Sequence, residues 1–175
     1  FGQCADYVAL QAIADKWNLW IVEDTAQALG ADINGKRAGT FGQVGAISFY
    51  PTKNLGAFGD AGCCVTNDDL LAERMLQIRH HGRAQTGGVY NYVDLGLNSR
   101  LDAFQAALLS VKLPLLDEVN KRRAQIAERY NAALSTIPFI RVPEQIVGTH
   151  VYHQYSIVAQ DLGGMSCRDS LATFL

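Results

Sequence analysis

A lysine and a pair of acidic residues are the side chains of this sequence best suited to chemistry. Lys53 lies in the run Ser48-Phe49-Tyr50-Pro51-Thr52-Lys53-Asn54, downstream of Glu23-Asp24-Thr25-Ala26-Gln27. A lysine amine forms a Schiff base with an aldehyde cofactor, and a carboxylate keeps the nitrogen of a pyridine ring protonated. A hydroxyl such as Ser48, five residues before the lysine, can hold a phosphate while the amine reaches the aldehyde. The two runs therefore predict a cofactor site around Lys53.

Two further runs extend the pattern, namely Gly59-Asp60-Ala61-Gly62 and Tyr92-Val93-Asp94-Leu95-Gly96-Leu97-Asn98-Ser99-Arg100. In combination the four runs resemble the DegT/DnrJ/StrS-type sugar aminotransferases, which are pyridoxal-phosphate (PLP) enzymes of the aspartate aminotransferase superfamily. The resemblance extends from Gly2 to about Leu175 and implies an α/β chain of PLP-transferase fold type I. Such a chain comprises part of the large mixed-sheet domain and the start of the small C-terminal domain. We expect an internal piece of a longer protein, which lacks the upstream phosphate cradle.

The resemblance also implies a role for each site residue. Asp24 would contact the pyridine nitrogen, and Gln27 the ring near its phenolic oxygen. Ser48 would bind the PLP phosphate, and Lys53 would form the Schiff base and then shuttle the proton. Asn98 would reach across a homodimer interface to the phosphate in the neighbouring subunit.

Ordinary structural roles compete with these assignments. An isolated Ser48 could be a buried hydroxyl bonded to the backbone. Glu23 is interpreted as one side of a structural salt bridge, and Arg100 as part of an intrahelical or interface ion pair. Asn98 or Ser99 could cap the helix that follows.

The implied reaction moves an amino group from L-glutamate to a nucleotide-linked keto-deoxysugar. Asp60 and the run 96–102 resemble family members that act at C3. The alternatives are a C4 sugar aminotransferase, a dehydratase of the same family, and a non-catalytic regulatory or interaction protein. A dehydratase has histidine in place of the Schiff-base lysine, so Lys53 argues against it. A protein that no longer used PLP would have no physical need to retain Asp24, Ser48, Lys53 and Asn98 together.

The amino-acid composition limits the classes of binding partner that we expect. The 175 residues are 49% hydrophobic and 18% charged, which is typical of an ordinary globular protein. A net charge of −2 gives no electrostatic case for nucleic acid or an anionic membrane. No apolar run reaches the ~18 residues that a membrane span requires. We therefore expect a cytoplasmic protein without a membrane or nucleic-acid partner.

The cysteines and histidines do not have the spacing of metal ligands. The four cysteines, Cys4, Cys63, Cys64 and Cys167, do not have zinc-ligand spacing, and we expect reduced thiols in or near a core. His80 and His81 are adjacent, so on a helix they point about 100° apart and cannot easily share a metal ion.

Hydrophobic periodicity places these residues on alternating helices and strands, the pattern of an α/β fold. Leu19–Val22 reads as a buried strand that leads to Asp24, and the loop Lys53–Ala61 lies between two strands. The basic run Lys121-Arg122-Arg123 is interpreted as a solvated helix face.

We expect domains at 1–134 and 135–175, and a dimer interface that buries the loop Tyr90–Tyr92. The expected helices are 5–17, 70–81, 101–111 and 114–134; the expected strands are 19–22, 46–49, 62–66, 137–143 and 152–158; a turn is expected at Asn34-Gly35.

Overall fold

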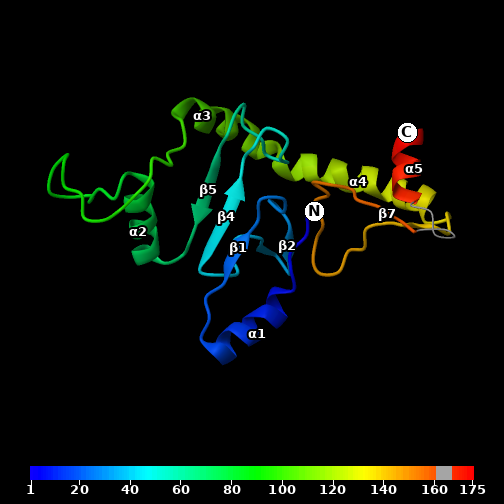
Figure 1. Cartoon of the computed structure of the whole chain (residues 1–175), viewed down its shortest axis with the longest axis horizontal. Coiled ribbons are helices and arrows are strands. Elements are labelled where there is room, and N and C mark those ends of the chain that lie inside the picture. Colours follow the sequence, from blue (N-terminus) through cyan, green and yellow to red (C-terminus); the bar gives the residue numbers. More distant parts are fainter. Residues whose placement is uncertain (161–166) are drawn as a thin grey trace.

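A mixed three-stranded sheet is the centre of the computed structural model, which describes residues 1–160 and 167–175. Its strand order is β1-β4-β5, with β1 at Val22–Asp24, β4 at Val44–Ser48 and β5 at Gly62–Val65 (Figure 1). β1 runs parallel to β4, with Asp24 opposite Ala46, whereas β5 is antiparallel to β4. The predicted strands at 46–49 and 62–66 are therefore confirmed to within two residues.

Two small antiparallel pairs complete the strands. β2 (Asp32–Ile33) and β3 (Lys36–Arg37) form a hairpin whose turn residues Asn34 and Gly35 have φ of 51° and 83°. Positive φ at both central positions is what a tight hairpin turn of this kind requires, so the predicted turn is confirmed. β6 (Ile140–Arg141) pairs with β7 (Val158–Ala159). β6 is shorter than the predicted strand at 137–143, and β7 overlaps the predicted strand at 152–158 only at Val158.

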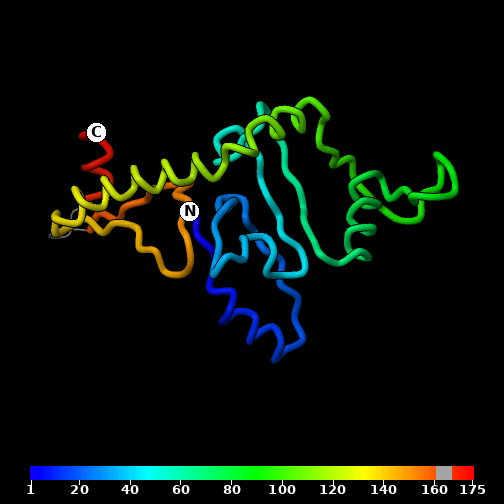
Figure 2. Tube along the Cα trace, turned by 180° about the vertical axis from the view of Figure 1, so that it is seen from behind, coloured from blue at the N-terminus to red at the C-terminus, as the bar shows by residue number. Residues whose placement is uncertain are grey.

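Helices lie on two sides of the sheet. α3 and the long α4 run across one end, and α1 lies at the opposite end (Figure 1). Seen from behind, α2 and the loop after it extend away at one side, and the C-terminal segment lies at the other (Figure 2). Asp6 caps α1 and Asp68 caps α2 through backbone amides of the first turn. The helices are α1 Tyr7–Trp17, α2 Asp69–Arg79, α3 Ala103–Lys112, η1 Leu113–Leu115, α4 Leu116–Leu134 and α5 Cys167–Phe174.

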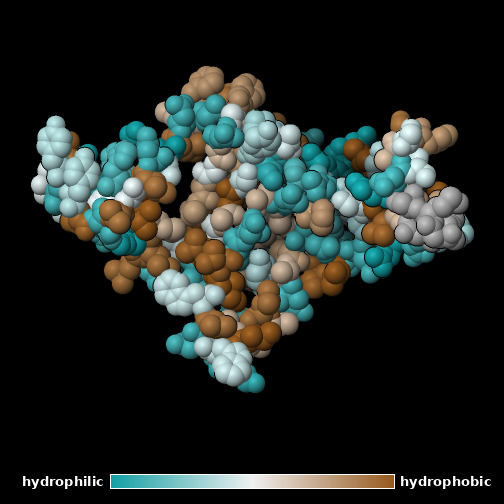
Figure 3. Space-filling view, in the orientation of Figure 1, coloured by the Kyte–Doolittle hydropathy of each residue, from teal (hydrophilic) through white to brown (hydrophobic). Residues whose placement is uncertain are grey.

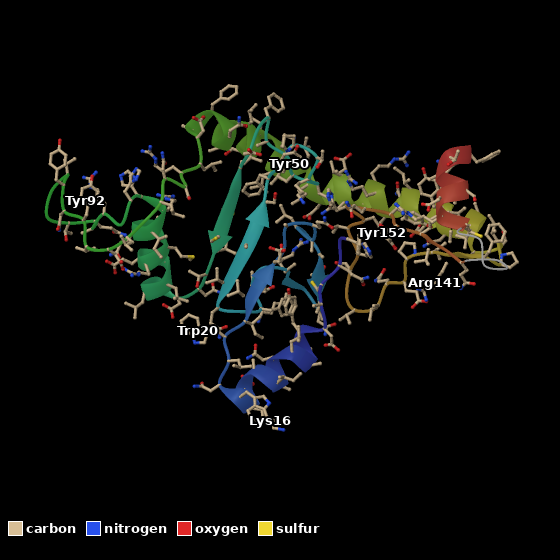
Figure 4. All side chains as sticks on the ribbon, viewed as in Figure 1. Lys16, Trp20, Tyr50, Tyr92, Arg141 and Tyr152 are labelled. Carbon is tan, nitrogen blue, oxygen red and sulfur yellow. The ribbon has the colours of Figure 1, made fainter. Side chains whose placement is uncertain are left out.

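The expectation of a buried strand at Leu19–Val22 is wrong. Pairing with β4 begins only at Val22, and Leu19, Trp20 and Val22 are all more than half exposed. β1 is an edge strand with a neighbour on one side only. Figure 3 shows hydrophobic residues gathered over the sheet and α1, and Figure 4 shows Trp20 beside the lower end of the sheet. A hydrophobic run alone does not reveal whether another layer of the protein covers it.

The expected cap of α3 is also wrong, because Asp102 caps this helix and its side chain accepts from the Phe104 amide at 2.8 Å. Asn98 and Ser99 instead belong to a segment that pairs with the end of α2. The Ser99 amide donates to the Arg79 carbonyl at 3.0 Å, and Asn98 forms a bridge with His80. A capping residue directly precedes the first residue of its helix, and α3 begins only at Ala103.

Two clusters of buried apolar residues hold the fold. The first joins α1 to the β2–β3 region, and Val151 reaches it from the far end of the chain. The second joins Leu55 and Ala57, close to Lys53, to Leu109 of α3 and Leu116 of α4. Cys4 is buried in the first cluster as expected, whereas Cys64 is exposed. No helix within the described ranges is both long and apolar enough to cross a bilayer.

Candidate active site

Asp24 and Ser48 project from the same face of the sheet, at the carboxyl ends of adjacent parallel strands. Asp24 pairs with Ala46, and Ser48 follows Ala46 by two positions, so all three side chains point to one side. The Asp24 carboxylate is exposed, and its Oδ1 accepts from the Ala26 amide at 3.0 Å. Ser48 Oγ accepts from the Tyr50 amide at 3.3 Å. The edge beyond the carboxyl ends of strands is where α/β folds bind ligands.

Glu23 lies on the opposite face and is only 1% exposed. Its two carboxylate oxygens accept from the amides of Gly39 at 2.8 Å and Gly42 at 2.6 Å. The expected salt bridge is therefore wrong, although the expected structural role is correct, because backbone amides satisfy this charge. Burial and then the nearby Glu23 carboxylate raise the pKa of Tyr7 to about 12.

The backbone of the Lys53 loop is fixed against α3. The Lys53 amide donates to the Tyr50 carbonyl at 2.8 Å. The Phe58 amide donates to Gln105 Oε1 at 2.8 Å, and Lys112 Nζ donates to the Gly56 carbonyl. Lys53 itself is half-buried, so a rigid frame holds its side chain at the protein surface.

Asn54 connects this loop to distant parts of the chain. Its Nδ2 donates to Asn120 Oδ1 at 2.7 Å and to the Val151 carbonyl at 3.1 Å, and its Oδ1 lies 3.1 Å from His153 Nδ1. Burial lowers the pKa of His153, and the positive charge of Lys53 lowers it further. His153 therefore contacts the residue that directly follows the lysine. Sequence reasoning missed His153, because its separation from Lys53 in the chain gives no local signal.

The basic run on α4 is only partly the solvated face that we expected. Lys121 and Arg122 are exposed, but Arg123 is half-buried. Its guanidinium donates to the carbonyls of Tyr152 at 3.1 Å and His153 at 3.4 Å. Figure 4 shows Tyr152 alongside α4. Arg123 thus helps to hold the segment that brings His153 to the site.

Gln27 follows β1 in a turn that Thr25 fixes against β4, since Thr25 Oγ1 donates to the Ala46 carbonyl at 2.7 Å. Gln27 is half-buried near Asp24 in the chain. Asn98 is exposed, and its Oδ1 accepts from Arg100 Nε at 3.0 Å, so Arg100 makes this bond in place of the expected ion pair. Within the described residues, no hydrogen bond joins Asn98 to the Lys53 loop.

The loop beyond α2 is exposed along most of its length. Tyr90 is 87% and Tyr92 55% exposed, and Figure 4 shows Tyr92 on the outlying part of this loop. The expected burial of this loop in a dimer stays a prediction. Among the residues that the structure describes, no group of three or more His, Cys, Asp or Glu side chains is placed to hold a metal ion.

The whole chain, residues 1–175, matches the profile of the DegT/DnrJ/EryC1/StrS aminotransferase family. It is 46% identical to the "Pleiotropic regulatory protein" of Geobacillus stearothermophilus, over 100% of this chain and 45% of that protein. It is 44% identical to the dTDP-3-amino-3,4,6-trideoxy-alpha-D-glucose transaminase of Streptomyces venezuelae, over 90% of this chain and 41% of the relative.

A solved structure agrees with these sequence matches. S. venezuelae DesV, in complex with a ketimine intermediate, superposes with a TM-score of 0.89 and 41% identity. The superposition covers 99% of this chain and 44% of DesV. The chain thus spans less than half the length of the relatives that it matches. The expected family and the expected α/β fold are both confirmed.

Proposed function

Because this chain belongs to the DegT/DnrJ/EryC1/StrS aminotransferase family, we propose that the protein is a PLP-dependent aminotransferase of nucleotide-linked keto-deoxysugars. The observation that carries the proposal is the shared sheet face of Asp24 and Ser48 beside the rigid Lys53 loop. These three side chains supply a carboxylate, a hydroxyl and an amine at one edge of the sheet.

The donor set fits PLP. Among the described residues, Asp24 is exposed and bonds only through Oδ1, to a local amide, so Oδ2 is available to the ring nitrogen. Ser48 Oγ accepts one amide, and its own proton can go to a phosphate oxygen. Lys53 would hold the aldehyde carbon, and Gln27 would contact the ring near its phenolic oxygen. PLP, when bound, supplies an electron sink for the carbanion that forms at the amino-acid carbon.

Lys53 would act twice in the proposed reaction. Its amine would hold the cofactor's aldehyde carbon and, once free, would carry a proton from the α-carbon of the amino donor. With the sugar ketone, the same amine would carry the proton in the opposite direction. The backbone bonds at Tyr50, Gly56 and Phe58 hold the loop that carries this lysine in place.

We propose L-glutamate as the donor and C3 of the sugar as the aminated position. The run Gly59–Gly62 with Asp60 supports C3 by resemblance. So does the similarity to a transaminase whose name specifies a 3-amino sugar. The test gives the purified full-length protein, with PLP and glutamate, a nucleotide-linked 3-keto-6-deoxyhexose or its 4-keto isomer. We expect faster turnover of the 3-keto sugar, and Lys53→Ala should abolish turnover of both. Equal or faster turnover of the 4-keto sugar would reject C3 and leave the aminotransferase assignment intact.

A non-catalytic regulatory role is the second candidate, because one relative is named a regulatory protein. A protein of this kind would not need a reactive lysine. An absorbance scan with added PLP, followed by addition of glutamate, separates the two. A catalytic protein should bind PLP and convert it to the amine form, whereas no spectral change with either addition would favour the regulatory role. We further propose a cytoplasmic homodimer with domains at 1–134 and 135–175.

A further inference from the structure

The side chain of Asn120 is a buried polar group that links two segments of the candidate site. Asn120 lies near the start of α4 and is 8% exposed. Its Oδ1 accepts from Asn54 Nδ2 at 2.7 Å, and its Nδ2 donates to the Leu29 carbonyl at 3.1 Å. One amide group therefore joins the residue after Lys53 to the turn that follows Asp24 and Gln27.

The turn is shaped to receive this amide. Gly30 has φ of +93°, and a Cβ built there would lie 2.4 Å from Asn120 Nδ2. Only glycine leaves room for the amide at this distance and adopts this φ without strain. The contact therefore depends on both residues: Asn120 supplies a buried amide from α4, and Gly30 has no side chain that would block it.

Asn120 connects Asp24 to Lys53 through residues that lie close to each of them in the sequence. Asp24 is fixed by its pairing with β4, and Gln27 and Leu29 follow it within the next five residues. Asn54 follows Lys53 and also contacts His153, whose pKa responds to the lysine charge. A shift of the Asn120 amide would therefore move the lysine loop relative to the carboxylate. In reactions that depend on near-attack geometry, a displacement of ~1 Å can lower the rate about 100-fold.

We propose that Asn120 is a positioning residue, which acts through Asn54 and Leu29 to hold the Lys53 loop at a fixed place relative to Asp24. This inference rests on the proposed function, because it assigns the separation of these two groups a catalytic purpose. Asn120 touches neither cofactor nor substrate in this scheme. A purely structural asparagine would stabilise α4 without any effect specific to the lysine.

The first experiment needs no cofactor. Amide hydrogen exchange is measured by mass spectrometry on the full-length apoprotein, with Asn120→Ala compared with Asn131→Ala. Asn131 is a matched control on the same helix, since its Oδ1 accepts from the Tyr155 hydroxyl at 2.7 Å, remote in the chain from the lysine loop. We expect peptides covering 49–58 to exchange at least ~10-fold faster in Asn120→Ala only, because local opening becomes easier. Unchanged exchange in this loop would overturn the proposal.

The second experiment uses the PLP-loaded protein and a double-mutant cycle of Asn54→Ala and Asn120→Ala. Asn120→Ala should lower kcat ~10- to 100-fold with little change in the KM for the sugar. If Asn120 acts through Asn54, the double variant should lose little more than Asn54→Ala alone. Additive losses, or an equal loss in Asn131→Ala, would overturn the positioning role.

A third variant guards against simple unfolding. Asn120→Asp keeps the acceptor for Asn54 but puts a carboxylate oxygen where the Leu29 carbonyl needs a donor, so exchange in peptides covering 27–31 should rise above wild type. Wild-type exchange in these peptides would contradict the proposed linkage. A wild-type protein that binds no PLP would reject the proposed function, while the apoprotein exchange would still test the linkage itself.

Discussion

Glu23 and Asp24 are neighbours in the chain, yet they face opposite sides of the sheet and have opposite environments. Glu23 is 1% exposed and accepts two backbone amides, whereas Asp24 is exposed at the end of β1. Strand geometry alone produces this division, because successive side chains alternate between faces. One carboxylate of the pair is thus committed to holding the loop at Gly39–Gly42, and the other is left for a ligand.

The two acidic residues should respond differently to amide substitution. Glu23→Gln places an NH2 group against one of the two amides that need acceptors, and we expect a loss of ~1–3 kcal/mol in the free energy of unfolding. Asp24→Asn keeps Oδ1 for the Ala26 amide, so its stability should stay within ~0.5 kcal/mol of wild type. Urea unfolding of both variants checks this. PLP binding should be weakened in Asp24→Asn, and a stability loss as large as that of Glu23→Gln would contradict the assigned roles.

Lys53 should be the residue that PLP modifies. Borohydride reduction of the PLP-treated protein, followed by peptide mass mapping, should place the added mass on Lys53. Lys121→Arg is the matched control, because Lys121 is exposed on α4 and has no place in the site. That variant should label as wild type does. A label on another lysine, with Lys53 unmodified, would reject the assignment.

Asn98 should act in the site of the partner subunit. Lys53→Ala and Asn98→Ala homodimers should each be impaired, because every site lacks one group. Dissociated and mixed, they should form hybrid dimers with one intact site, which restores roughly a quarter of the wild-type activity if subunits of a two-fold dimer pair at random. No recovery, in a mixture shown by mass spectrometry to contain hybrids, would mean that Asn98 acts within its own subunit or not at all.

His150 should make stability depend on pH in the acidic range. It is 5% exposed, and its Nδ1 accepts from the Tyr152 amide at 2.9 Å. Burial lowers its pKa from 6.5 to about 4. Between these values the unfolded chain binds a proton that the folded chain does not. Stability from this residue is therefore complete above pH 6.5 and lost as the pH falls towards 4.

The size of this effect is on the order of 3 kcal/mol, from the difference between the two pKa values. Urea unfolding of wild type and His150→Gln at several pH values between 4 and 7 measures it. The variant should be less stable at pH 7 but should show a shallower decline towards pH 4. Equal slopes in the two proteins would contradict the assigned burial of a neutral imidazole.

The sequence by itself determined the family, the α/β class and the residues with reactive groups. These depend on local signals: the motif spacing around Lys53 and the Asn34-Gly35 turn. Each of these signals lies within a few residues of the chain, so it can be interpreted without knowledge of tertiary contacts. The same local reading failed at Leu19–Val22, where burial depends on whether another layer covers an edge strand.

Only the tertiary structure decided which partners each polar group has. In the structure, Glu23 binds the amides of Gly39 and Gly42 and not a cation. Asp102 caps α3. His153 and Asn120 both contact Asn54 in the lysine loop. Asn54 and Asn120 are separated by 66 residues, and Asn54 and His153 by 99. The physical reason is that hydrogen bonds between such distant residues arise only when helices and strands pack, and no local pattern encodes that packing.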